Sequence, residues 1–333
     1  MHQAAFILTS PPVIDRVYGH GRRERVAQCA ELYPTIITPQ NFDEHREQLA
    51  RTQVIFSTWS MFEPTEQQLD AMGQLQAVFY AAGSVQRFAR PFLERDILVV
   101  TAAAMNAIPV AEFTLAQIIL ANKGYWHNMA ACATPEGRAE AGSTVGPGNY
   151  GQTVGLLGAG AIGRLVIDLL KPLELNVLVW DPFLSEEQAD RLGVEKVDDL
   201  PEVFERANVI SNHLANKEEI RGLIDRACFE RMGQGTTFIN TGRGAQINEA
   251  DLAAVFEARP DLTALLDVTM PEPPEADSAF YRLPNVHLTS HIAGSLNQEV
   301  LHMADFVIDQ YQRWAAGDSP EGRVTLEMLA TMA

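Results

Sequence analysis

The chain has 333 residues, of which 47% are hydrophobic and 20% charged, an ordinary composition for a globular protein with room for two domains. Its formal net charge of −18 argues against nucleic acid or an anionic membrane as a partner, because both bind to protein surfaces on which Lys and Arg are clustered. An anionic substrate would need a local positive site set into this acidic protein.

The three cysteines (Cys29, Cys132 and Cys228) are far apart and form no CxxC pair, so neither a disulfide framework nor a metal site is expected. The N-terminus lacks a basic region followed by an apolar run and a small-residue cleavage site, so no signal peptide is predicted. The most apolar stretch, 107–121, is interrupted by Glu112 and Gln117 and is not expected to span a membrane. These features favour a cytoplasmic protein.

Residues 1–100 alternate short apolar segments with amphipathic ones. The apolar segments predicted as buried strands are Ala4–Leu8, Val54–Ser57, Ala77–Ala81 and Ile97–Val100. Amphipathic segments such as Phe42–Arg51 and Glu66–Gly73 lie between them. This alternation predicts a parallel sheet that helices cover on both faces.

The second half of the chain repeats this alternation. Pro109–Lys123 is predicted as a helix, and 132–151, rich in Gly, Pro, Ala and Ser, as a surface loop. Strands and helices alternate again from Thr153 to about residue 290, and Asn297–Trp314 is predicted as a closing amphipathic helix. The predicted fold class is α/β, with two parallel-sheet domains of the Rossmann-like or flavodoxin-like type.

A glycine motif lies between the predicted strand Thr153–Leu157 and the predicted helix Ala161–Leu170. The next predicted strand, Asn176–Trp180, completes a unit of the size that βαβ requires. In such a unit the first glycine permits a tight turn, the second admits a pyrophosphate, and the third lets helix and strand pack closely. The residues predicted to contact a dinucleotide here are Gly158, Ala159, Gly160, Ala161, Ile162 and Gly163.

Asp181 ends the second strand of this unit. A carboxylate at that point can accept hydrogen bonds from the adenosine ribose hydroxyls and would repel a 2′-phosphate. Residues 182–187 contain no Lys or Arg to neutralise such a phosphate, so NAD is favoured over NADP. The alternative is that Asp181 only caps a turn before Pro182.

Three further segments carry chemistry: NTGRGA (240–245), TMPEPP (269–274) and TSHIAG (289–294). Each follows a predicted strand, at the edge where open parallel sheets bind ligands. They offer Arg243, whose planar guanidinium group can donate hydrogen bonds to two substrate oxygens at once. They also offer His291, an acid or base near neutral pH. They also offer Glu272, because a carboxylate beside a histidine holds the ring and favours its charged form. The set suits hydride transfer to or from a small carboxylate substrate.

The residues alone leave these assignments open. Other ionisable residues near strand ends or in the same loop compete for the same roles: His213, His287, Glu275 and Asp277. Arg243, flanked by two glycines, could instead tie down a loop.

The region 103–295 resembles the cofactor domain of the NAD-dependent D-2-hydroxyacid dehydrogenase family, and the similarity extends more faintly over the whole chain. The matching segments are GLLGAGAIGR, SNHLANKEEIRGLI, FINTGRGAQINEADL, ALLDVTMPEPP and NVHLTSHIAGS. The resemblance implies an NAD-binding Rossmann domain over 103–295 and a discontinuous substrate domain of 1–102 plus 296–333. It also implies an active-site cleft between the domains and a homodimer built on the cofactor domain.

Roles for single residues follow from this resemblance. It implies that Arg243 binds the substrate carboxylate and carbonyl, and that Glu272 pairs with the catalytic His291. Further cofactor contacts implied are His213, Thr241, Gly242, Asp267 and Ala293.

The segment FYAAGSVQRF (79–88) resembles the family's substrate loop. Backbone N–H groups of Gly83, Ser84 and Val85 would then face the substrate carboxylate.

The expected function is hydride transfer between NAD(H) and a small D-2-hydroxy acid or 2-oxo acid, with His291 donating the proton during reduction. The family's glyoxylate/hydroxypyruvate reductase and short phosphoglycerate dehydrogenase branches fit best. The alternative is a non-catalytic NAD(H)-sensing interaction protein, since the family also resembles transcriptional corepressors. The identity of the substrate is left open by the sequence. Arg87 and Arg90 favour a substrate with a phosphate, whereas Trp59 and Phe62 favour a substrate with an apolar group.

Overall fold

The structure is a computed structural model that describes residues 1–329, and of Ser143 and Thr144 only the backbone. The chain divides into two compact units, Met1–Ala107 with Ser295–Ala333, and Ile108–Gly294. The last four residues of the predicted substrate domain, 330–333, lie outside the described residues. The two units are called unit 1 and unit 2 below.

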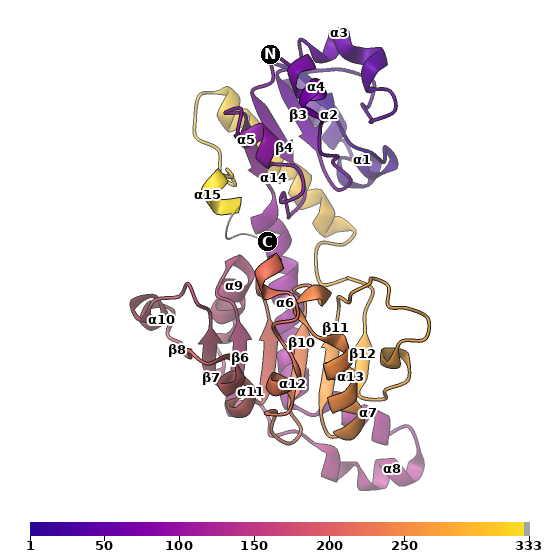
Figure 1. Ribbon diagram of the computed structural model, residues 1–333, viewed down its shortest axis with the longest axis vertical. Coiled ribbons are helices and arrows are strands. Elements are labelled where there is room, and N and C mark those ends of the chain that lie inside the picture. The colour runs from indigo at the N-terminus through magenta and orange to yellow at the C-terminus, as the bar shows by residue number, and fades with distance from the viewer. Residues whose placement is uncertain (330–333) are drawn as a thin grey trace. The chain divides into compact units, whose positions relative to one another are not determined.

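Unit 1 is built on a five-stranded sheet of order β2-β1-β3-β4-β5, in which every neighbouring pair is parallel (Figure 1). Its strands are β1 (Gln3–Phe6), β2 (Glu31–Leu32), β3 (Val54–Ser57), β4 (Ala77–Tyr80) and β5 (Leu98–Thr101). Its helices are α1 (Pro12–Val17), α2 (Arg22–Cys29), η1 (Phe42–His45), α3 (Arg46–Leu49), α4 (Glu66–Ala71), α5 (Arg90–Leu93), α14 (Gln298–Ala315) and α15 (Leu326–Leu329).

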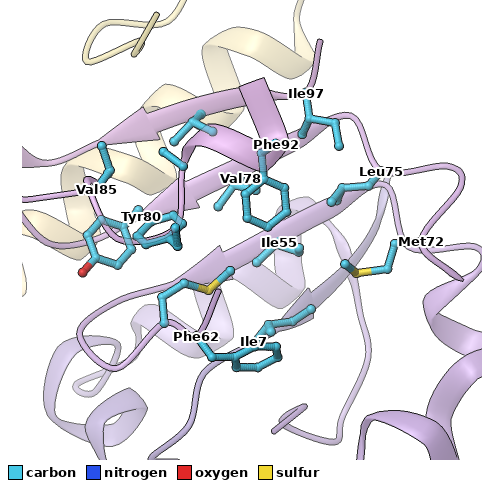
Figure 2. Packing of buried hydrophobic residues seen from close by; sticks show 14 of the residues in the cluster. Ile7, Ile55, Phe62, Met72, Leu75, Val78, Tyr80, Val85, Phe92 and Ile97 are labelled. Carbon is cyan, nitrogen blue, oxygen red and sulfur yellow. The ribbon is translucent and has the colours of Figure 1, made fainter. Parts of the chain in front are cut away.

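Successive strand residues of unit 1 point to opposite faces of the sheet, and both faces are apolar. One face packs against α3, α4 and α5, and its buried cluster includes Ile55, Val78 and Tyr80 (Figure 2). The other face packs against α1, α2 and α14, whose Tyr311 lies 5.5 Å from Phe79 between ring centroids. Helix α14 therefore belongs to the core of the first sheet.

Unit 2 is built on a seven-stranded parallel sheet of order β12-β11-β10-β9-β6-β7-β8 (Figure 1). Its strands are β6 (Tyr150–Leu157), β7 (Glu174–Trp180), β8 (Glu195–Lys196), β9 (Val209–Asn212), β10 (Thr237–Asn240), β11 (Thr263–Leu266) and β12 (Val286–Leu288). The chain leaves β6 for β7 on one side and later returns to β9 on the other. The carboxyl ends of β6 and β9 therefore form the switch point where such sheets bind ligands.

Helices on both faces cover this sheet, and the predicted α/β class with two parallel-sheet domains is confirmed. The helices that follow β5 in the chain and precede α14 are α6 (Ala103–Asn122), α7 (Tyr125–Ala131), α8 (Pro135–Glu140), η2 (Ala141–Thr144), α9 (Ala161–Leu170), α10 (Glu186–Leu192), α11 (Leu200–Arg206), η3 (Glu218–Ile220), α12 (Arg226–Phe229), η4 (Gly244–Gln246), α13 (Glu249–Ala258) and η5 (Ala279–Tyr281). The first turns of α6 belong to unit 1.

The predicted surface loop over 132–151 is wrong, because the segment contains α8 and η2. Thr134 caps α8 by accepting a hydrogen bond from the Gly137 N–H at 3.0 Å, and Pro135 occupies the first turn, where its missing N–H costs nothing. A good cap outweighs the low helix propensity of the small residues around it.

Helix α6 begins at Ala103, six residues before the predicted start at Pro109, which lies inside the helix. By length and composition α6 could cross a membrane, in contrast to the expectation that Glu112 and Gln117 interrupt it. Its Ala111 and Ile118, however, pack in the core of unit 2. Core helices have the same composition as spanning ones, so one such helix is a weak indication of a membrane span.

Candidate functional site

The three motif glycines follow β6 and differ in what surrounds them. Gly158 has φ +96°, and a Cβ there would lie 2.9 Å from the carbonyl oxygen of His213. A Cβ on Gly163 would lie 2.1 Å from the carbonyl oxygen of Gly158, whereas one on Gly160 would meet no atom of the described residues within 4 Å. Gly158 and Gly163 are therefore required by the turn and its packing, and Gly160 faces open space.

The backbone of this turn offers unpaired donors. Gly160 is the N-cap of α9, and no side chain of the described chain caps the helix. Among residues 1–329, the N–H groups of Gly160, Ala161 and Ile162 donate to no protein acceptor. Free N–H groups and the positive end of a helix dipole together favour an anion, so this turn fits the pyrophosphate of a dinucleotide.

A matched pair of alanine variants separates packing from binding in this turn. Gly163→Ala should lower the free energy of unfolding by about 1–3 kcal/mol, because its Cβ overlaps the Gly158 carbonyl. Gly160→Ala should leave unfolding unchanged and weaken NADH binding instead. Urea unfolding and NADH fluorescence titration measure the two effects. A fully stable Gly163→Ala variant would refute the steric argument.

Asp181, directly after β7, has both carboxylate oxygens engaged. Oδ2 accepts a hydrogen bond from the Ala159 N–H at 2.7 Å, and Oδ1 accepts one from the Phe183 N–H at 2.8 Å. The residue thus caps the turn before Phe183 and also lies beside the glycine turn. The Lys217 amine reaches this neighbourhood from the loop after β9 and lies 5.0 Å from the Phe183 ring centroid. Local sequence could not show that contact.

His213 is buried after β9. Its Nε2 lies 3.0 Å from Ser211 Oγ, and its Nδ1 lies 3.5 Å from the hydroxyl of Thr241, which is also buried. Burial lowers the pKa of His213 to about 3, so the imidazole is neutral near pH 7. Burial also lowers the pKa of His287, with the nearby His127 adding to the effect. Neither ring is a good proton donor near neutral pH.

The loop that carries Arg243 follows β10 and is held by buried amides. Asn240 Oδ1 accepts a hydrogen bond from the Gly242 N–H at 3.0 Å, and Gln246 Oε1 accepts one from the Arg243 N–H at 3.1 Å. Asn212 at the end of β9 donates to both of these side-chain oxygens. The backbone of the loop is therefore held by side chains other than the Arg243 guanidinium group.

The Arg243 guanidinium is half-buried and donates to the Gly242 carbonyl oxygen at 2.7 Å. Within the described part of the chain no carboxylate lies within 4.0 Å of it. Burial lowers its pKa, and the charge of Glu272 acts in the opposite direction. A partly desolvated cation with spare donors is suited to binding an anionic ligand.

His291 and Glu272 are brought together from separate loops. His291 Nδ1 lies 2.7 Å from Glu272 Oε1, and the two side chains are 47% and 43% exposed. In the described residues neither Glu275 nor Asp277 makes such a contact with His291. Among residues 1–329 no protein group bonds Nε2 of His291, which leaves this nitrogen for a ligand. Since the charge of Glu272 also acts on Arg243, all three groups form one cluster in unit 2.

Asp267 follows β11 and is 2% exposed. Its Oδ1 accepts hydrogen bonds from Thr289 Oγ1 at 2.6 Å and from the Ile292 N–H at 2.7 Å, and its Oδ2 accepts one from the Ala293 N–H at 2.9 Å. Its carbonyl oxygen accepts the His291 N–H at 3.0 Å. Asp267 thus holds His291 at φ +59°, a positioning contact that sequence reasoning missed.

We expect Asp267→Asn to lower the free energy of unfolding by about 2 kcal/mol or more, because an amide cannot accept all three hydrogen bonds and buries an unmatched donor. Urea unfolding measures the change. Asp261→Asn, which removes a partly exposed pair with Arg259, is the control and should cost less. Equal losses in the two variants would contradict the positioning role.

The predicted substrate loop follows β4 in unit 1. Its Gly83 carbonyl oxygen accepts a hydrogen bond from Thr101 Oγ1 at 2.6 Å. In the chain up to residue 329, the N–H groups of Gly83, Ser84 and Val85 donate to no protein acceptor. Gly83 and Ser84 are at least partly exposed, whereas Val85 is buried.

A doubly wound parallel sheet with a glycine turn at its switch point defines a dinucleotide-binding protein. Residues 123–293 match the family described as D-isomer specific 2-hydroxyacid dehydrogenase, NAD binding domain. The chain therefore belongs to this dehydrogenase family, and that segment is its NAD-binding domain.

Curated relatives include D-3-phosphoglycerate dehydrogenase of Archaeoglobus fulgidus, 34% identical over 224 residues, which are 67% of this chain and 42% of that protein. (S)-Sulfolactate dehydrogenase of Chromohalobacter salexigens is 31% identical over 220 residues, 66% of this chain and 71% of that protein. The chain thus spans less than half the length of the phosphoglycerate dehydrogenase.

Among solved structures, D-mandelate dehydrogenase of Rhodotorula graminis has a TM-score of 0.79 at 21% identity, covering 97% of this chain and 98% of that one. At this identity the likeness shows the fold alone.

Proposed function

We propose that this protein transfers hydride between NAD(H) and a small D-2-hydroxy acid or its 2-oxo acid. The observation that carries the proposal is the His291–Glu272 hydrogen bond of 2.7 Å beside a half-buried Arg243 that has no ion-pair partner in the described chain. An oriented acid or base next to a free guanidinium is what reduction of a 2-oxo acid requires.

Each residue has one task in this proposal. Arg243 binds the carboxylate and polarises the carbonyl of the substrate. His291 donates the proton that the carbonyl oxygen gains during reduction and takes it back during oxidation. Glu272 orients the ring through its hydrogen bond with Nδ1. The N–H groups of Gly83, Ser84 and Val85 serve as donors to substrate carboxylate oxygens.

Bound NADH supplies the hydride that C2 of the substrate accepts. The chain offers the glycine turn for the pyrophosphate and Asp181 for the adenosine ribose. His213, Thr241, Gly242, Asp267 and Ala293 are proposed to surround the rest of the cofactor. For Asp267 this contact would come in addition to the hydrogen bonds that its carboxylate already accepts.

A kinetic screen tests the proposal. Purified protein with NADH is assayed by absorbance against glyoxylate, hydroxypyruvate, phenylpyruvate and 3-phosphohydroxypyruvate, and turnover of at least one is expected. Tight NADH binding without turnover of any 2-oxo acid would instead favour the NAD(H)-sensing interaction protein.

A homodimer is part of the proposal. Tyr125 and Met129 on α7 and Val145 after η2 are exposed apolar residues in the cofactor unit. Burying such residues against a second copy would offset their exposure. Light scattering should give a dimer mass, and Met129→Glu should shift it towards the monomer.

A cytoplasmic location is also proposed, because Cys29, Cys132 and Cys228 are free thiols.

A further inference from the structure

The loop that carries Glu272, residues 269–274, has few backbone groups that can hold it in place, and it is called the Glu272 loop below. Three of its residues are prolines, which have no N–H, so only three can donate from the backbone. Over residues 1–329, just one of these N–H groups donates to a protein acceptor. It is the N–H of Met270, and its acceptor is Oε1 of Glu249 at 2.7 Å.

Glu249 reaches this N–H from a firmly packed element. It is the first residue of α13, a helix whose Leu252 and Phe256 are buried in the core of unit 2. The glutamate is half-buried, and burial raises the pKa of its carboxyl group, while the hydrogen bond from Met270 acts in the opposite direction. The carboxylate is therefore partly withdrawn from water at the point where it meets the Glu272 loop.

A second contact places the same loop against the loop of Arg243. A Cβ on Gly244, the residue after Arg243, would lie 2.0 Å from the carbonyl carbon of Thr269. The two loops can approach this closely only because Gly244 has no side chain. The Glu272 loop is thus held by packing at Thr269 and by a hydrogen bond at Met270.

We propose that Glu249 is a positioning residue for the active site. By accepting the Met270 N–H it fixes the Glu272 loop, and through that loop it fixes the carboxylate that hydrogen-bonds His291. This inference rests on the proposed function, in which Glu272 orients His291. Glu249 itself takes no part in proton or hydride transfer. Its task needs an acceptor of the right reach, because a hydrogen bond requires the acceptor within about 3 Å of the donor nitrogen.

Two conservative variants separate the reach of the side chain from its charge. Glu249→Gln keeps an oxygen acceptor of the same reach and should keep the kcat of the wild type. Glu249→Asp keeps the charge in the first turn of α13, where it is favourable, but is one methylene shorter and should lose the hydrogen bond.

For Glu249→Asp, kcat should fall about tenfold while KM and NADH affinity stay near the wild-type values, because a misplaced orienting group impairs the chemical step. Steady-state kinetics with NADH and the best 2-oxo acid of the screen measure kcat and KM. Glu257→Asp, at an exposed position of the same helix, is the control and should match the wild type.

A double-mutant cycle tests whether Glu249 acts through Glu272. In a Glu272→Ala background, Glu249→Asp should lower kcat no further, because no carboxylate is left to position. A residue that acts independently of Glu272 would lower kcat by the same factor in both backgrounds. That additive result overturns the proposal. A wild-type kcat for Glu249→Asp, or an equal loss of kcat in Glu249→Gln and Glu249→Asp, also overturns it.

Nuclear magnetic resonance of protein with isotope-labelled histidine gives a readout that needs no turnover. The ring signals of His291, assigned by their loss in His291→Ala, report its hydrogen bond with Glu272. Glu249→Asp should shift these signals in the direction seen for Glu272→Ala, whereas Glu249→Gln should leave them unchanged. If the wild type turns over no 2-oxo acid, the dehydrogenase proposal fails and these signals decide. The shift supports the positioning role, and unchanged signals in Glu249→Asp overturn it.

Discussion

Replacing His291 with alanine should lower kcat by about 10²–10⁴-fold, the usual worth of a positioned general acid or base. The ring is held by the Glu272 carboxylate on one nitrogen and by the loop that Asp267 fixes. NADH affinity should be nearly unchanged, because the imidazole acts on the proton of the substrate. Turnover followed by NADH absorbance and binding followed by NADH fluorescence separate the two quantities.

Two further variants sharpen this prediction. Glu272→Gln keeps an acceptor for Nδ1 but removes the charge, so its kcat should fall less than that of His291→Ala. His302→Ala changes an exposed histidine of α14 and should behave like the wild type. A wild-type kcat in His291→Ala would end the assignment of this residue as the acid.

Much of the fold follows from local sequence patterns. The predicted bounds of β3 and α9 match the structure, because an apolar run that ends at Ser57 and a glycine turn just before Ala161 mark where these elements stop and start. Helix α8 and the early start of α6 were missed. In these two segments capping and tertiary packing decide the structure, and neither is visible in an apolar pattern.

The sequence alone predicted only part of the chemistry of the site. Residue types and strand ends pointed to Arg243, yet the choice of His291 and Glu272 over their competitors rested on family resemblance. The structure supplies a physical reason, because His213 is buried and only Glu272 of the loop carboxylates contacts His291 in the described chain. The positioning contacts of Asp267 join residues more than 20 positions apart, and no local pattern reveals them.

Replacing Arg243 with lysine should lower kcat/KM by about 10²-fold or more, comparable to removing a fixed donor from a developing oxyanion. The change keeps the positive charge, but the compact ammonium group of lysine cannot donate hydrogen bonds to the substrate carboxylate and the carbonyl oxygen at the same time. The loop should keep its fold, since Asn240 and Gln246 hold it through its backbone. Steady-state kinetics with NADH and the best 2-oxo acid of the screen give the ratio.

The matched control is Arg282→Lys, which changes an exposed arginine whose side chain donates only to the Asp277 carbonyl oxygen among the described contacts. It should leave kcat/KM unaltered. Arg243→Ala tests the guanidinium directly, because free guanidinium ion added to that variant should restore part of its activity, whereas a purely structural arginine would show no rescue. If Arg243→Lys retains kcat/KM within threefold of the wild type, the substrate carboxylate is bound elsewhere and Arg243 serves the loop alone.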